Sequence, residues 1–261
     1  MIKTLVIAQQ VWRETLRRKD LYVLFILLLA FFVALMTLNV FGLKSLVNHI
    51  KELGLLLVWI FGWFLTVGVS ARQLPQEEKS GTIFSLLAKP VGRAELLIGK
   101  WLGASSLAGL ATFFFYIILT GIVVARGGNF SPVLAAEAFL LQFCFIGVLA
   151  ALGLLFSARM HGDAAATLTA VLSVAAFLLL PQAPQWSANL DGWQRQVLLA
   201  VYYALPHLEI FDLRRRMVYD WEALRLETLV MIIAYGVLMT AAFLLIAWLA
   251  YRNKKFSRDI L

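Results

Sequence analysis

Long runs of apolar residues without charged side chains dominate the pattern along the chain. A membrane-spanning helix needs roughly 20 mostly apolar residues, and a charge at mid-bilayer costs about 2.5–3.5 kcal/mol on insertion scales. The stretches that meet both conditions, with Glu137 as the one charged exception, are 21–43, 53–71, 101–125, 132–158, 164–181 and 228–251. The pattern predicts an all-α membrane protein with six transmembrane helices.

The distribution of Lys and Arg predicts how these helices are oriented. Cytoplasmic loops carry an excess of both residues. They are frequent before the first span, in segment 72–100 and after the last span, whereas the short loops on the other side hold only Lys44, Lys51 and Arg126. Both termini are therefore expected in the cytoplasm, as an even number of spans requires. The Arg residues of segment 182–227 oppose this pattern, but long loops follow the rule poorly.

Residues 1–20 show a different pattern, with apolar side chains at three-to-four spacing. From Ile2 to Leu16 these side chains fall near one helical face, and basic side chains lie off that face. This arrangement favours an amphipathic helix in the cytoplasmic membrane interface, with its tryptophan among the headgroups. The alternative is a plain basic leader. The candidate interfacial residues are Trp12, Arg13, Arg17 and Arg18.

Segment 72–100 has too many charges to span a bilayer, yet its apolar residues are ordered. Glu77, Glu78 and Lys79 precede a short apolar patch, and Pro90 follows the patch. This order favours a short helix with a docking face over a loose linker. The alternative is a solvated helix start whose acids lie near the positive end of the helix dipole. The patch consists of Ile83, Phe84, Leu86 and Leu87.

Segment 182–227 is rich in aromatic residues. Pro181 is expected to end the fifth span, and an apolar helical stripe from Val197 to Leu205 stops before Pro206. Trp and Tyr concentrate at membrane interfaces, so we expect one or two short helices at, or dipping into, the outer leaflet. The aromatic residues are Trp186, Trp193, Tyr202, Tyr203, Tyr219 and Trp221.

Composition and motifs exclude several classes of function. Only 15% of the residues are charged and 62% are hydrophobic, so lipid must cover much of the surface. The net charge of +8 then indicates cytoplasmic loops and anionic lipid rather than nucleic acid. The chain has no Gly-x-x-x-x-Gly-Lys-Ser/Thr loop, so it is not expected to hydrolyse ATP itself.

Few residues suggest a catalytic or metal site. His49, His161 and His207 lie in different loops, and no metal site is expected from them. Glu137, near the start of the fourth span, is interpreted as interfacial, with a substrate or proton site as the alternative. The single cysteine, Cys144, cannot form an internal disulfide.

Segment 72–100 resembles the cytoplasmic loop of ABC-2 type permeases. The segment ValTyrTyrAlaLeuProHisLeuGluIlePheAspLeu and the ending PheSerArgAspIleLeu also look like motifs of that family, although His207 stands where Asn is commoner. The resemblance covers nearly the whole chain and includes the branch with the permease for nitrous oxide reductase maturation. The matching loop residues are Glu77, Glu78, Gly81, Thr82, Leu86, Leu87, Pro90, Arg93, Gly99 and Lys100.

The resemblance implies a permease subunit that exports or extrudes a substrate across the cytoplasmic (inner) membrane. It implies two copies of a separate ABC ATPase, which bind ATP and Mg²⁺, and a second permease chain in a homodimer. The chain itself is expected to bind lipid but no cofactor, metal or nucleic acid. The N-terminal helix and segment 72–100 would dock on the ATPase. The coupling candidates are Glu77, Glu78, Gly81, Thr82, Phe84, Leu87, Pro90 and Arg93.

Two other functions stay compatible with the sequence. A six-span scaffold or assembly factor would use segment 72–100 to recruit a soluble protein other than an ATPase. A membrane enzyme acting on lipid would use polar side chains of the outer segment, which are His207, Glu209, Asp212 and Arg214–Arg216. Neither the cargo nor the direction of transport follows from the residues.

Overall fold

The computed structural model describes residues 2–17, 19–37, 43–79, 92–188 and 192–252. These residues form helices and their connections, and no strand occurs among them. The all-helical fold predicted from the sequence is therefore confirmed for the part of the chain that the structure describes.

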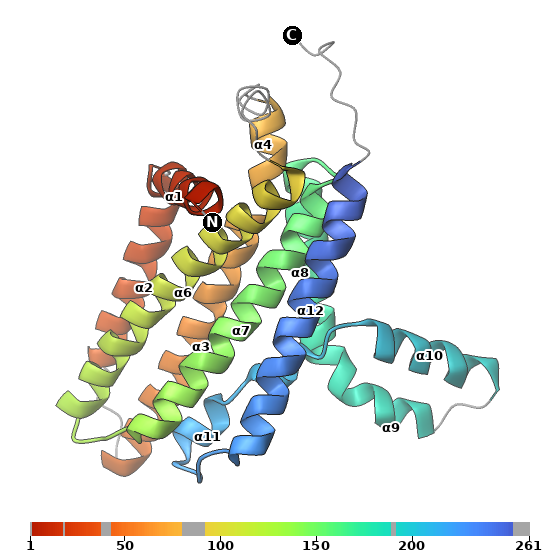
Figure 1. Cartoon of the computed structure of the whole chain (residues 1–261). Coiled ribbons are helices and arrows are strands. Elements are labelled where there is room, and N and C mark those ends of the chain that lie inside the picture. The colour runs from red at the N-terminus through yellow and green to blue at the C-terminus, as the bar shows by residue number, and fades with distance from the viewer. Residues whose placement is uncertain (1, 18, 38–42, 80–91, 189–191, 253–261) are drawn as a thin grey trace.

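A bundle of long helices forms the body of the protein (Figure 1). Its members are α2 (Lys19–Thr37), α3 (Leu43–Ser70), α6 (Arg93–Ala125), α7 (Pro132–Ser157), α8 (Gly162–Leu179) and α12 (Leu226–Arg252). Helix α7 lies in the middle, where it packs against α3, α6, α8 and α12. Every residue from Phe145 to Leu154 is buried, so the core of the bundle follows this helix.

Five helical stretches among the described residues are long and apolar enough to cross a membrane. They are Val47–Lys79, Arg93–Ala125, Pro132–Ser157, Gly162–Ala188 and Leu226–Arg252. Helix α2 adds a shorter apolar stretch, Phe25–Ala34. The predicted first span, 21–43, includes residues 38–42, which lie outside the described residues.

Two helices extend beyond the spans predicted from charge-free runs. Helix α3 begins at Leu43 rather than at residue 53, and α6 begins at Arg93 rather than at residue 101. The predicted loop 72–100 is therefore helical from residue 93 onward. The charges of Lys51 and Lys100 exclude these residues from the predicted spans, but both side chains are buried in helices and paired with acids.

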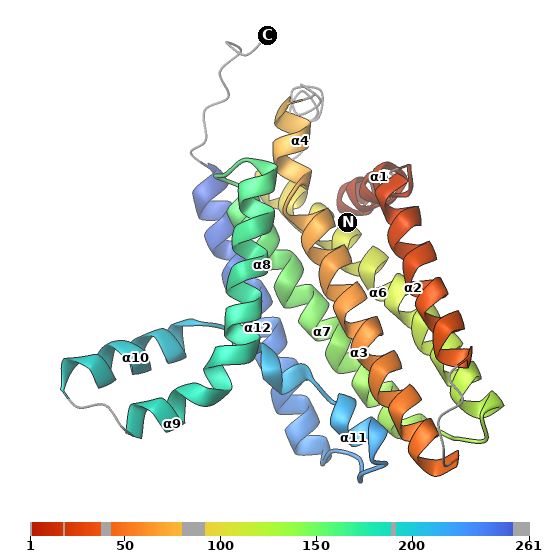
Figure 2. The ribbon, with the colours of Figure 1, turned by 180° about the vertical axis from the view of Figure 1, so that it is seen from behind.

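Segment 182–227 first forms a helical hairpin at the side of the bundle and then packs against the bundle again. The 3₁₀ turn η1 (Leu180–Gln182) and α9 (Ala183–Ala188) continue from α8, and α10 (Trp193–Ala204) leads back (Figures 1 and 2). The hairpin projects sideways, and α10 has no buried residue. The turn η2 (Leu208–Phe211) and α11 (Arg214–Val218) then join the bundle, where α11 contacts α3 and α7.

The two ends of the bundle carry different elements (Figure 1). Helix α1 (Ile2–Leu16) and helix α4 (Gln73–Lys79) lie at the same end as the C-terminal end of α12. We call this the α4 end. Helix α11 and the N-terminal ends of α3 and α12 lie at the opposite end, which we call the α11 end.

A buried lysine ties the α11 end together. Nζ of Lys51 lies 3.0 Å and 2.9 Å from the two carboxylate oxygens of Asp220, and 4.9 Å from the ring centroid of Phe130. The side chain of Lys51 is 2% exposed and that of Asp220 is 57% exposed. The pair joins α3 to the connection between α11 and α12.

We expect Asp220→Asn to lower the free energy of unfolding by about 1–3 kcal/mol. Removing one partner of a fully buried pair costs about 3–5 kcal/mol, and the exposure of Asp220 reduces this loss. Asn also tolerates the positive φ of 48° at this position. Thermal unfolding in detergent micelles measures the effect.

Lys51→Met is the matched variant, because it removes the buried charge together with its need for a partner. It should destabilise the protein less than Asp220→Asn. An Asp220→Asn protein that unfolds at the wild-type temperature would show that the pair contributes nothing.

Candidate functional site

A buried ion pair attaches α4 to α6. Nζ of Lys100 donates to Oε1 of Glu77 at 2.6 Å, and the two side chains are 1% and 6% exposed. Charge-assisted hydrogen bonds of this length are among the stronger ones, and separating such a pair would leave an uncompensated charge inside the protein. The short helix α4 is therefore fixed to the longest helix of the bundle.

The neighbouring residues of α4 point differently. Glu77 is buried, Glu78 is partly buried and Lys79 is exposed. Helix α4 also contacts α7 and α8, and Nη2 of Arg72, just before it, lies 3.1 Å from Oδ1 of Asp163 on α8. Adjacent acids in the sequence thus occupy different environments, one inside the protein and one at its surface.

Arg93 attaches the start of α6 to the end of α12. Its Nη1 donates to the carbonyl oxygen of Tyr251 at 2.8 Å and to that of Arg252, and its Cζ lies 5.9 Å from the ring centroid of Tyr251. The last carbonyl groups of a helix have no partner within the helix and attract positive charge. Arg93 therefore caps α12.

The beginning of α6 is set locally by Glu95. The backbone N–H of Gly92 donates to Oε2 of Glu95 at 3.0 Å. An acid in the first turn also lies favourably at the positive end of the helix dipole. This local cap explains why α6 can start as early as Arg93, ahead of its apolar run.

Helix α1 packs closely against the same part of α6. A Cβ atom at Gly99 would lie 2.8 Å from Cβ of Ile7, and one at Gly103 would lie 2.7 Å from Cβ of Val11. Real Cβ atoms do not approach so closely, so both positions require glycine. Their four-residue spacing puts both on one helix face, the small-x-x-x-small arrangement that lets helix backbones approach.

Trp12 completes the contact between α1 and α6. Its Nε1 donates to Oγ of Ser106 at 2.9 Å, and the side chain is half-buried. The sequence predicts this indole among lipid headgroups, whereas the structure directs its N–H to α6. Arg13 on α1 and Arg17, just after α1, are exposed, and Arg18 lies outside the described residues.

The structure brings together only part of the predicted coupling set. Glu77, Glu78 and Arg93 all lie at the α4 end. The remaining candidates lie in segment 80–91, outside the described residues, and are Gly81, Thr82, Phe84, Leu87 and Pro90. Lys100 matches the family loop, but neither it nor Gly103 is among the coupling candidates predicted from the sequence. The lone lysine in an apolar helix was a signal for a buried acidic partner, but the identity of that partner depends on the fold.

Other polar residues singled out in the sequence have partners at the connections between helices. Oε2 of Glu137, which is buried, accepts a hydrogen bond from the backbone N–H of Leu224 at 3.1 Å. Arg214 and Asp212 form a bidentate ion pair, in which Nε of Arg214 donates to Oδ1 of Asp212 at 2.8 Å and Nη2 donates to Oδ2 at 2.7 Å. The guanidinium of Arg214 lies 5.2 Å from the ring centroid of Trp59. These contacts hold the connections at the α11 end in place.

No group of three or more His, Cys, Asp or Glu side chains among the described residues is arranged to hold a metal ion. His207 and Glu209 do form a pair, with Nδ1 of His207 3.2 Å from Oε1 of Glu209. Asp212 is instead engaged with Arg214. Four polar residues of the proposed lipid-enzyme site are thus divided between two separate pairs, and Nη1 of Arg216 donates instead to the carbonyl oxygen of Glu222 at 3.1 Å.

Comparison with known proteins identifies one matching family. A family model described as "ABC-2 family transporter protein" matches residues 5–256. The matched range includes all six helices of the bundle and the contacts that join α1, α4 and α12 to α6. A search of curated proteins finds no relative that matches the chain.

We expect Gly103→Val to loosen α1 from α6. Overpacking a tight contact costs about 1–3 kcal/mol, which corresponds to roughly 5- to 150-fold faster opening. Hydrogen–deuterium exchange of residues 2–16 measures this change. Gly121→Val is the control, because a Cβ at that position of α6 meets no other atom within 4 Å. Equal exchange in both variants would contradict the assigned role of the glycine.

Proposed function

Because the chain belongs to the ABC-2 family of transporter proteins, we propose that it is the permease of an ATP-driven exporter. Membership makes the chain the integral membrane component of a transporter, without an ATPase domain of its own, and implies a separate ATPase partner. To this we add export as the direction, the bacterial-type cytoplasmic membrane as the location, and a homodimer served by two ATPase subunits.

The Glu77–Lys100 pair is the observation that carries this proposal. The α4 end contains α1, α4, the first turns of α6 and the last turn of α12, and these elements carry Lys3, Arg13, Lys79, Arg93, Lys100 and Arg252. Since positive residues favour the cytoplasmic side, the α4 end faces the cytoplasm in our proposal. A partner that holds α4 then acts on α6 directly, because a buried ion pair resists separation.

Helix α6 is suited to transmit a displacement through the membrane. It has 33 residues, and at 1.5 Å per residue it is about 50 Å long. At its first turns it holds the end of α12 through Arg93, and it holds residues 4–11 of α1 through Gly99 and Gly103. Movement of the ATPases on ATP binding would therefore shift α4, α6, α1 and α12 together.

Helix α2 supplies the sixth span in this proposal. Its 19 residues are about 28 Å long, close to the hydrocarbon thickness of roughly 30 Å. The ring of Phe115 on α6 lies 4.7 Å from that of Phe25 and 5.9 Å from that of Phe32, so one face of α2 packs on the bundle. The other face exposes large apolar side chains that lipid would cover: Val23, Ile26, Leu27 and Val33.

In this proposal the docking surface combines α4, segment 80–91 and the exposed arginines at the end of α1. Glu78 offers a carboxylate to a basic groove on the ATPase, and Arg13 and Arg17 offer the opposite charge. The apolar residues Phe84 and Leu87 would anchor the contact, since buried apolar side chains carry most of the energy of an interface. Gly81, Thr82, Pro90 and Arg18 complete the proposed set.

The first test is whether an ABC ATPase co-purifies with the chain and whether its ATP hydrolysis depends on the chain. We expect Glu78→Lys to weaken ATPase binding by about tenfold or more, because it reverses a charge at the docking surface. Glu222→Lys, at an exposed position in the connection between α11 and α12, should leave binding unchanged. Recruitment of a soluble protein other than an ATPase would favour a scaffold instead.

The second test separates coupling from stability. Glu77→Gln should lower both the unfolding temperature and the ATP hydrolysis that depends on the permease. The double variant Glu77→Gln, Lys100→Met should regain stability, because no charge is left buried without a counter-charge. It should not regain coupled hydrolysis, because the strong link between α4 and α6 is absent. Recovery of both properties would assign the pair a structural role alone.

A further inference from the structure

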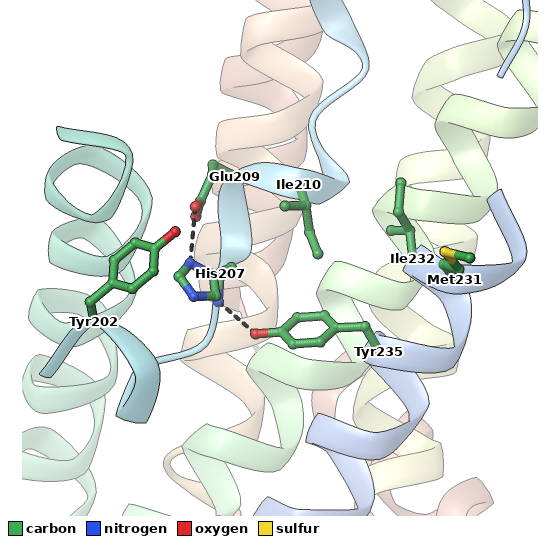
Figure 3. A pocket seen from close by; sticks show the side chains of 7 residues that line it. All are labelled: Tyr202, His207, Glu209, Ile210, Met231, Ile232 and Tyr235. Atoms are coloured by element: carbon green, nitrogen blue, oxygen red, sulfur yellow. Dashed lines mark hydrogen bonds and ion pairs between the residues drawn. The ribbon is translucent and has the colours of Figure 1, made fainter. Parts of the chain in front are cut away.

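A surface cavity of about 380 Å³ lies where the α9–α10 hairpin joins the bundle. Its volume falls in the range of roughly 300–1,000 Å³ that is typical of small-molecule sites. Its lining is polar or aromatic at Tyr202, His207, Glu209 and Tyr235, and it is apolar at Ile210, Met231 and Ile232 (Figure 3). The cavity is remote from the α4 end.

Three elements build the cavity, and a hydrogen bond fixes their arrangement. Tyr202 comes from α10, Glu209 from η2 and Tyr235 from α12. The backbone N–H of His207 donates to the hydroxyl of Tyr235 at 2.8 Å (Figure 3). Because α10 ends at Ala204 and Pro206 follows, the chain turns there and brings His207 against α12.

The polar part of the lining contains one acid, Glu209. Oε1 of Glu209 contacts Nδ1 of His207 at 3.2 Å, whereas the buried Oε2 has no hydrogen-bond partner among the described residues. A neutral imidazole supplies one hydrogen bond and no counter-charge. A carboxylate with one buried, unsatisfied oxygen is costly in apolar surroundings, so a bound cation would stabilise it.

The rings beside Glu209 favour the same kind of ligand. The ring centroid of His207 lies 4.5 Å from that of Tyr202 and 6.4 Å from that of Tyr235. Faces of tyrosine rings attract ammonium groups, most strongly where water is excluded. An anion would meet the carboxylate of Glu209, and a purely apolar ligand would leave that charge uncompensated.

We propose that this cavity binds an amphipathic cation. The ammonium or trimethylammonium head lies against Glu209 and the rings of Tyr202 and Tyr235, and the hydrocarbon tail lies along Ile210, Ile232 and Met231. Met231 is 69% exposed, so the apolar part of the lining opens to the surface of α12, which lipid would cover. The site needs no ATPase, so it stands independently of the proposed coupling.

Equilibrium dialysis of radiolabelled dodecyltrimethylammonium tests the proposal on the full chain in neutral detergent micelles. We expect saturable binding that Glu209→Gln weakens at least tenfold, because the amide keeps the shape but removes the charge. Tyr202→Leu should also weaken binding, through loss of the ring. The matched control is Glu227→Gln, an exposed acid of α12 outside the cavity, which should bind as wild type does.

Competitors identify the chemistry and the source of the ligand. Dodecanol and dodecyl sulfate should compete at least tenfold less well than unlabelled dodecyltrimethylammonium, and equal competition by dodecanol would overturn the proposal in favour of a plain apolar groove. Competition by lysophosphatidylcholine would assign the site to a lipid headgroup, and its absence to a free amphipathic cation. The proposal would also be overturned if both Glu209→Gln and Tyr202→Leu bound dodecyltrimethylammonium with wild-type affinity.

Discussion

Charges inside a lipid-embedded bundle have to be paired, and this constraint organises both ends of the protein. Water is not available to solvate a bare ammonium group there, so each lysine buried in the described part of the chain lies against a carboxylate. Lys100 meets Glu77 at the α4 end, and Lys51 meets Asp220 at the α11 end. Each pair ties a short connecting segment to a long helix, and the positions of α4 and of the α11–α12 connection depend on them.

Helix α6 contacts α4, α12 and α1 at the α4 end. Lys100 holds α4, Arg93 caps α12, and the glycines at positions 99 and 103 admit α1 to a distance that any larger side chain would prevent. All of these positions lie within the first turns of one helix. An external partner acting on any attached element therefore acts on the whole group, which is the mechanical basis of the function we propose.

The α11 end and the hairpin have a different character. Their polar residues form pairs within the connections, such as Asp212 with Arg214, and Glu137 binds the backbone just before α12. His207 and Glu209 belong to a cavity that is partly lined by apolar side chains. Coupling chemistry and ligand chemistry thus occupy separate parts of the molecule, joined by α6, α7 and α12.

The sequence by itself determined the helical, membrane-embedded character of the chain, because runs of apolar residues as long as 132–158 exclude other folds. It also indicated the chain break before Pro206 and a helix within residues 2–16, since both depend on neighbours along the chain. Only the tertiary structure decided that Lys51 and Lys100 are helical and buried, because a charge is tolerated there only with a partner, and those partners are distant in sequence. The same holds for Trp12, whose N–H meets Ser106, and for the cavity at Glu209, whose walls come from three separate elements. The order of residues along the chain shows periodicity and hydropathy, whereas ion pairs and hydrogen bonds between helices depend on how the bundle packs.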